Sequence, residues 1–202
     1  MKLLFLDCET GGLDEQETSL LSVGMTVWED SNIKNVFEIY VKEPVLRVTS
    51  KSLAINKIDL RKFDQIAVPV DEAWIKIKQF IYRNFGLNKD KFKMAGMNPT
   101  FDIRFMKQCF GKEHIEKWFS HKTIDIQAII TYLYNKGNLS EDCASSEKSY
   151  KYFNINNGIV DHMALKDCLN EIKIYEVLLK MDLSKGSVID SLTYYSRTSI
   201  VE

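Results

Sequence analysis

The stretch Lys-Leu-Leu-Phe-Leu-Asp-Cys-Glu-Thr, residues 2–10, decides the fold of this chain. Its apolar run is typical of a buried β-strand, which we expect over Lys2–Asp7 and which the next two glycines end. Because side chains alternate across a strand, Asp7 and Glu9 project to the same face. Two carboxylates at the end of the first strand are therefore the first candidates for a functional site.

Two further carboxylates and a histidine stand at comparable places. Asp102 follows Asn98 and Pro99 at the start of a predicted helix, and His162 and Asp167 open a late one. Carboxylates gathered from distant segments repel one another, so such a cluster needs a cation, and Mg²⁺ and Mn²⁺ prefer oxygen ligands. The pattern predicts a two-metal site that acts on phosphate, with His162 available for proton transfer.

Three N-terminal strands and two later ones are expected to form the sheet. Segments 19–28 and 35–42 carry β-branched and aromatic residues at strand-like length, and their short connections favour antiparallel pairing. Short apolar runs at 92–95 and 123–125 predict the last two strands. This order of elements predicts an α/β fold with a mixed sheet covered by helices.

Helical spacing of apolar residues and capping residues predict the helices. Residues 135–148 are polar with small side chains and predict a mobile loop. The expected helices are a short one capped by Thr49 or Ser50 and reaching Ile55, one from an Asp71 cap to Gly86, one from Asn98 and Pro99 to Gly111, one ending at Tyr134, and a long one from Asp161 or His162 to Met181.

The spacing of the late motif constrains its geometry. His162 and Asp167 are five residues apart, which is about 140° around a continuous helix at roughly 100° per residue. They converge only if His162 lies on the loop that enters the helix, and we expect this placement. The apolar stripe formed by Phe101, Phe105 and Met106 is interpreted as core.

Composition bounds the protein class. The 202 residues fit one domain, and 45% hydrophobic and 11% aromatic residues can support a substantial core. A net charge of −1 argues against a general polyanion binder. No apolar run has transmembrane length and no signal peptide is visible. The four cysteines are far apart without a Cys-x-x-Cys pair, which predicts reduced thiols and a cytoplasmic protein.

Two groups of basic residues could follow a phosphate backbone, but such groups more often form a solvated helix face. They are Arg104, Lys107, Lys112 and Lys117, and Lys51, Lys57, Arg61 and Lys62.

Three motifs in order carry a family resemblance. Asp-x-Glu ends the first strand, Asn-x-x-x-Asp opens a middle helix, and His-x-Ala-x-x-Asp opens a late helix. The chain thereby resembles the DEDDh 3'-5' exonucleases, which include the proofreading subunit of bacterial replicative DNA polymerase, RNase T and oligoribonuclease. The resemblance implies an exonuclease domain over residues 1–182 and a C-terminal extension over 183–202.

The resemblance also implies a ribonuclease H-like, mixed five-stranded sheet of order 3-2-1-4-5 with helices on both faces. It assigns His162 as general base, since free histidine titrates near pH 6.5 and a neutral ring can accept a proton. Two Mg²⁺ or Mn²⁺ ions would be held by Asp7, Glu9, Asp102 and Asp167. The implied substrate contacts are Thr10, Gly11, Gly12, Leu13 and Asn98.

The expected reaction is hydrolysis at the 3' end of single-stranded DNA or RNA, releasing nucleoside 5'-monophosphates. A DNA polymerase or a second copy of the chain stays open as a partner, and no membrane association is expected. The alternative is a nucleic-acid-binding or scaffold protein that keeps the fold without catalysis. The presence of all five site residues favours the enzyme, because a scaffold needs none of them.

Overall fold

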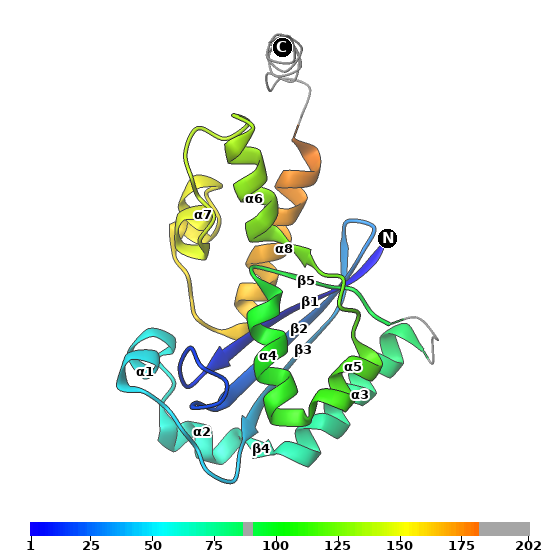
Figure 1. The fold of residues 1–202 in the computed structure, drawn as a ribbon, viewed down its shortest axis with the longest axis vertical. Coiled ribbons are helices and arrows are strands. Elements are labelled where there is room, and N and C mark those ends of the chain that lie inside the picture. Colours follow the sequence, from blue (N-terminus) through cyan, green and yellow to red (C-terminus); the bar gives the residue numbers. More distant parts are fainter. Residues whose placement is uncertain (87–90, 182–202) are drawn as a thin grey trace, which may run out of the picture.

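A mixed sheet organises the chain, whose computed structural model describes residues 1–86 and 91–181 (Figure 1). The strand order is β4-β3-β2-β1-β5-β6. The antiparallel strands β1 to β3 form the middle of the sheet. At one edge β4 pairs in parallel with β3, and at the other β5 pairs in parallel with β1 and with β6. The strands are β1 (Lys2–Thr10), β2 (Leu20–Glu29), β3 (Asn32–Lys42), β4 (Val68–Pro69), β5 (Met94–Gly96) and β6 (Ile124–Asp125).

The predicted order 3-2-1-4-5 is confirmed for the five predicted strands, which are β3, β2, β1, β5 and β6. The predicted count of five is wrong, because β4 adds a sixth strand beside β3. A two-residue strand is too short to show an alternating pattern. Its Pro69 can lie in the sheet because an edge strand tolerates the missing backbone N–H.

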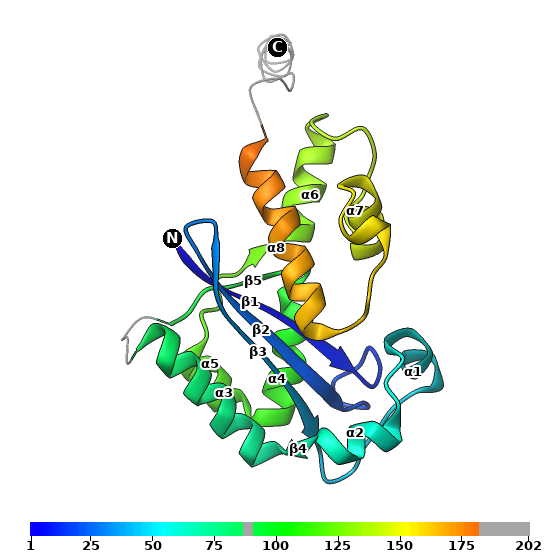
Figure 2. The same cartoon turned by 180° about the vertical axis from the view of Figure 1, so that it is seen from behind.

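Helices cover both faces of the sheet, as predicted (Figures 1 and 2). One face packs against α3 (Val70–Phe85), α4 (Pro99–Phe110) and α5 (Lys112–Trp118). The other face packs against α6 (Ile126–Asn135) and α8 (Ala164–Lys180), with α7 (Ser146–Tyr152) beside α8. The short helices α1 (Ser50–Asn56) and α2 (Leu60–Ile66) and a 3₁₀ turn, Asn156–Gly158, complete the described elements.

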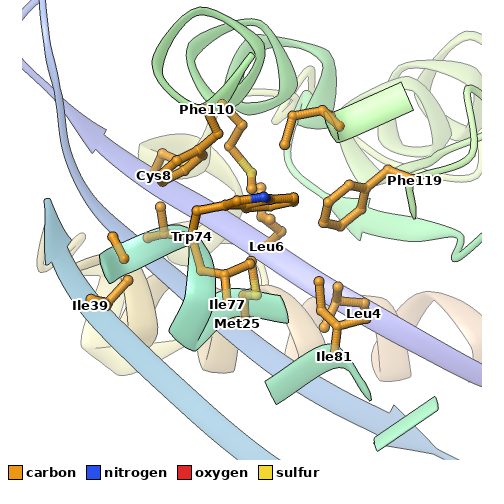
Figure 3. Packing of buried hydrophobic residues seen from close by; sticks show 14 of the residues in the cluster. Leu4, Leu6, Cys8, Met25, Ile39, Trp74, Ile77, Ile81, Phe110 and Phe119 are labelled. Carbon is orange, nitrogen blue, oxygen red and sulfur yellow. The ribbon is translucent and has the colours of Figure 1, made fainter. Parts of the chain in front are cut away.

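The alternation of β1 directs its side chains to two cores. Leu4, Leu6 and Cys8 belong to the same hydrophobic cluster as Trp74, whose ring stacks on that of Phe110 (Figure 3). Leu3 and Phe5 face the opposite way and belong to a second hydrophobic cluster, to which α6 and α8 also contribute residues. The same alternation carries the carboxylates at positions 7 and 9 toward α8, where the late motif lies.

Several helix boundaries differ from the prediction. The helix α3 starts at Val70 with Pro69 as its cap, so Asp71 lies in the first turn, where a negative charge is also favoured. The long helix α8 starts at Ala164 rather than at position 161 or 162. Thr49 does cap α1, its side chain accepting a hydrogen bond from the backbone N–H of Ser52.

Three short helices escaped the prediction. The helix α7 begins inside the segment interpreted as a mobile loop, and α2 and α5 were not expected. Each has seven residues, two turns at most, which is too few for a helical period to stand out.

The remaining general expectations have mixed outcomes. All four cysteines are unpaired, as predicted. In the described ranges no helix is both long and apolar enough to cross a bilayer. The proposed C-terminal extension, 183–202, lies outside the described residues, so its boundary stays a prediction.

Candidate active site

The end of β1 and the start of α8 bring three predicted site residues together. Glu9, His162 and Asp167 offer ligand atoms that all lie within 4.8 Å of one another. His162 precedes α8 and has a left-handed backbone with φ of 51°. The expected loop placement of His162 is therefore confirmed, and it lets the histidine reach Asp167 despite their five-residue spacing.

Asp102 is anchored to the middle of the first motif. It lies in the first turn of α4, is 3% exposed, and its Oδ1 accepts a hydrogen bond from the backbone N–H of Cys8 at 2.9 Å. Cys8 stands between Asp7 and Glu9, so this bond ties the start of α4 to the first motif. Asn98 caps α4 in a left-handed conformation without a side-chain cap bond, and Pro99 takes the first helical position as predicted.

Asp167 is held by hydrogen bonds on both carboxylate oxygens. The hydroxyl of Tyr150 donates to Oδ1 at 3.1 Å, and the backbone N–H of Met163 donates to Oδ2 at 3.2 Å. Tyr150 is fully buried and comes from α7. Sequence reasoning missed Tyr150 because it missed α7.

Glu171 is a further carboxylate that sequence reasoning missed. It lies four residues after Asp167 in α8, which is about 40° around the helix and thus on the same face. It is 2% exposed, and its Oε2 is buried without a hydrogen-bond partner in the described residues. The spacing of four from a predicted ligand was the one sequence signal that could have found it.

The carboxylates perturb one another strongly. Burial raises the pKa of Asp7 well above its usual range, and the charges of Asp102 and Glu171 raise it further. Burial likewise raises the pKa of Glu9 to about 8 and that of Asp102 to about 8. Without a cation the cluster therefore retains protons near neutral pH, and a bound cation would displace them.

This electrostatic arrangement predicts an unusual pH dependence of stability. A carboxyl group whose pKa is higher in the folded state stabilises the fold fully below its unfolded pKa, near 4, and loses this contribution as pH rises through the folded pKa. Because the pKa values of Glu9 and Asp102 are about 8, the free energy of unfolding in EDTA should fall between about pH 4 and about pH 8. Thermal unfolding across this range measures it. Saturating Mg²⁺ should flatten the slope, and equal slopes with and without metal would contradict the expectation.

Two cavities flank Glu9, and both Glu9 and Asn56 line each of them. The larger, of ≈ 760 Å³, is lined by Thr10, Gly12 and the 80% exposed Leu13. These three are predicted substrate contacts, and the cavity gives them a common surface. The remaining lining residues are Cys8, Asp14, Glu17, Thr18, Thr49, Lys51, Ser52, Ile55 and Phe101.

The other predicted contact residues lie elsewhere. Gly11 does not line either cavity, and a Cβ on it would lie 2.2 Å from the carbonyl oxygen of Arg47, so close backbone packing requires glycine there. The backbone N–H of Asn98 donates to Asp125 Oδ1 at 3.2 Å, joining α4 to the end of β6. A substrate role for Gly11 and Asn98 stays a prediction.

The apolar stripe of α4 divides between core and cavity. Phe105 and Met106 are buried in the core as predicted. Phe101 is only half-buried and lines the larger cavity, while its ring centroid lies 5.0 Å from that of Phe105. Phe101 is therefore available to an apolar group in this cavity.

The smaller cavity, of ≈ 440 Å³, joins His162 and Met163 to residues of α1 and α2. Lys57 and Lys62 line it, and neither has an ion-pair partner in the described part of the chain. By contrast, Arg104 lies 3.8 Å from Glu15, and Lys107 lies 2.9 Å from Glu116. Of the two basic groups in the sequence, the one around α1 and α2 thus places Lys57 and Lys62 beside the site, without an ion-pair partner among residues 1–86 and 91–181.

A ribonuclease H-like sheet with an acidic cluster at the end of its first strand defines a class of nucleases. The sequence matches the family model RNase_T, described as Exonuclease, over residues 4–175. The chain therefore belongs to this exonuclease family. None of the curated proteins matches the sequence significantly.

Solved structures share the fold at low identity. Cell-death related nuclease 4 has a TM-score of 0.67 at 21% identity, over 89% of this chain and 64% of its own. E. coli Exonuclease I in complex with a dA16 oligonucleotide has a TM-score of 0.70 at 16% identity, over 91% of this chain and 41% of its own.

The nuclease domain of 3'hExo, a DEDDh family member bound to rAMP, has a TM-score of 0.69 at 14% identity, over 89% of this chain and 92% of its own. The chain thus spans much less than the full length of the first two of these proteins and nearly all of the third. The resemblance to DEDDh exonucleases is confirmed at the level of family and fold.

Proposed function

We propose that the protein is a metal-dependent 3'-5' exonuclease that removes nucleoside 5'-monophosphates from single-stranded nucleic acid. The carrying observation is the cluster of Glu9, His162 and Asp167, in which Glu9 lines both cavities and His162 lines the smaller one. Buried Asp102 is joined to the same strand end. The oligonucleotide bound to E. coli Exonuclease I and the rAMP bound to 3'hExo support such a substrate.

The residues present fit divalent cations. Carboxylate oxygens are the preferred ligands of Mg²⁺ and Mn²⁺, and the buried Oε2 of Glu171 has no hydrogen-bond partner among the described residues. Asp7, Glu9 and Asp167 would hold one ion, and Asp7 with Asp102 the second. A bound metal pair supplies charge neutralisation at the attacking and leaving oxygens of a phosphodiester.

His162 is assigned as the proton acceptor. Its ring lies beside Glu9 and Asp167 and lines the smaller cavity, so it faces the space where an attacking water would stand. A neutral imidazole can take the proton from that water as the phosphorus–oxygen bond forms. The Tyr150 hydroxyl and the Met163 N–H hold the carboxylate of Asp167, next to His162, in a fixed orientation.

The two cavities suggest the path of the strand. The larger cavity offers Leu13, Ile55 and Phe101 as apolar surface for the base of the terminal nucleotide. The smaller cavity offers Lys57 and Lys62, which have no ion-pair partner among the described residues, to the phosphate on the 5' side of the penultimate nucleotide. The phosphodiester between the two nucleotides would then lie at Glu9.

The alternative, a scaffold without catalysis, is less well supported. Buried carboxylates that repel one another reduce folding stability unless a cation compensates them. A scaffold gains nothing from keeping Asp102 and Asp167 buried at 3% and 6% exposure next to Glu9. A polymerase or a second copy as partner, and a cytoplasmic location, stay predictions from the resemblance and from the cysteines.

The polarity of the reaction is the test of this function. A 5'-labelled single strand with a free 3'-hydroxyl, made as DNA and as RNA of the same sequence, should shorten progressively from its 3' end in Mg²⁺. A 3'-phosphate should block the reaction, because the larger cavity must accept the terminal nucleoside. A circular single strand is the matched control. Efficient cutting of the circle would reveal an endonuclease and overturn the proposal.

A further inference from the structure

Glu171 combines deep burial with a missing partner. Its side chain lies in α8, one turn after Asp167, and Oε2 has no hydrogen-bond donor in the described residues. Burying a carboxylate without compensation is costly, so a residue with only a packing role at this position would be apolar. We therefore expect a bound group to compensate the charge of this oxygen.

Gly96 makes room for this carboxylate. A Cβ on Gly96 would lie 3.3 Å from Glu171 Oε2 and 2.9 Å from the carbonyl oxygen of Leu6. Gly96 ends β5, and β5 pairs with β1 just before Asp7. Because Gly96 has no side chain, the carboxylate of Glu171 can lie against β5, close to the part of β1 that directly precedes Asp7.

The surroundings of Glu171 select a cation. Burial raises the pKa of Glu171 well above its usual range, and the charge of Asp102 raises it further. Burial likewise raises the pKa of Asp7, with further increases from the charges of Asp102 and Glu171. The backbone of Met97 acts in the opposite direction and lowers the pKa of Glu171. A water molecule could satisfy Oε2 but would leave the repulsion among the three carboxylates, whereas a cation removes both penalties.

We propose that Glu171 is a fifth carboxylate of the metal site and strengthens binding of the ion assigned to Asp7 and Asp102. This inference rests on the proposed function, since it extends the same metal site. Glu171 is a positioning residue in this account, because it acts on the substrate only through the ion.

Metal binding by the full chain tests the inference without an activity assay. Titration calorimetry with Mn²⁺ and thermal unfolding in EDTA should be compared for wild type, Glu171→Gln and the control Glu176→Gln. Glu176 lies in the same helix and accepts a hydrogen bond from Trp28 Nε1 at 2.8 Å, a bond that glutamine can keep. Both variants change the net charge equally.

Glu171→Gln should bind Mn²⁺ about 10-fold or more weakly, in the range of residues that support metal ligands. It should also unfold at a higher temperature in EDTA and gain less from added Mn²⁺. Glu176→Gln should match wild type in Mn²⁺ affinity. If Glu171→Gln does not fold, Glu171→Met replaces the carboxylate by an apolar chain of similar length, and the same loss of affinity is expected.

Wild-type Mn²⁺ affinity in the Glu171 variants would overturn the inference, and so would lower stability in EDTA with unchanged affinity, since that marks a purely structural role. The failure of the proposed function looks different. A protein that binds Mn²⁺ through Asp7 and Glu171 but hydrolyses no strand would refute the exonuclease and leave the fifth carboxylate standing.

Discussion

Replacing Asp7 by asparagine is expected to abolish hydrolysis of a single strand while the fold remains intact. Asp7 is the residue assigned to both ions, so its loss should exceed the roughly 10²–10³-fold cost of removing one preorganised electrostatic group. Burial and the charges of Asp102, Glu171 and Glu9 all raise the pKa of Asp7. The amide therefore relieves repulsion, and the metal-free variant should unfold at the same or a higher temperature than wild type.

Single-turnover rates in Mg²⁺ together with thermal unfolding in EDTA measure both parts of this expectation. The control is Asp71→Asn, which makes the same chemical change in the exposed first turn of α3. It should keep the wild-type rate. An Asp7→Asn protein that hydrolyses at the wild-type rate would show that the ions, or the chemistry, lie elsewhere.

Replacing His162 by alanine is expected to lower turnover by about 10²–10⁴-fold, the usual contribution of a general base. Metal affinity should change little, because the four assigned carboxylates remain. The proximity of the ring to Glu9 and Asp167 makes the measurement of Mn²⁺ affinity decisive. A histidine that ligated the ion would lose affinity on substitution, whereas a proton acceptor would lose turnover at saturating metal.

His121→Ala is the matched control for this substitution, since His121 is exposed and lies beside the cavity between α4 and α5. It should leave both turnover and affinity unchanged. Wild-type turnover in His162→Ala at saturating Mg²⁺ would contradict this role and would mean that another group or bulk solvent accepts the proton.

The strand order is implied by the family resemblance, whereas the joining of the distant motifs could be predicted because it follows from short-range patterns. The apolar run before Asp7 defines β1, and its alternation alone directs Asp7 and Glu9 to one face. The spacing of His162 and Asp167 excludes a continuous helix between them, and α8 indeed begins after the histidine. Such constraints are local, so the sequence contains them.

The supporting side chains could not be predicted, because their roles depend on tertiary packing. Tyr150 reaches Asp167 across 17 residues, from a helix hidden in a polar segment. A glutamate such as Glu171 on an amphipathic helix usually faces solvent. Its buried Oε2 lies where a Cβ on Gly96 of a neighbouring strand would approach it to 3.3 Å, and no spacing rule relates these two residues.

Mass spectrometry of the products released from a single strand with a free 3'-hydroxyl tests the two-metal exonuclease most directly. The account predicts nucleoside 5'-monophosphates that form in Mg²⁺ or Mn²⁺, disappear in excess EDTA, and return when the metal is restored. Undiminished release in EDTA, or nucleoside 3'-monophosphates as the products, would contradict it.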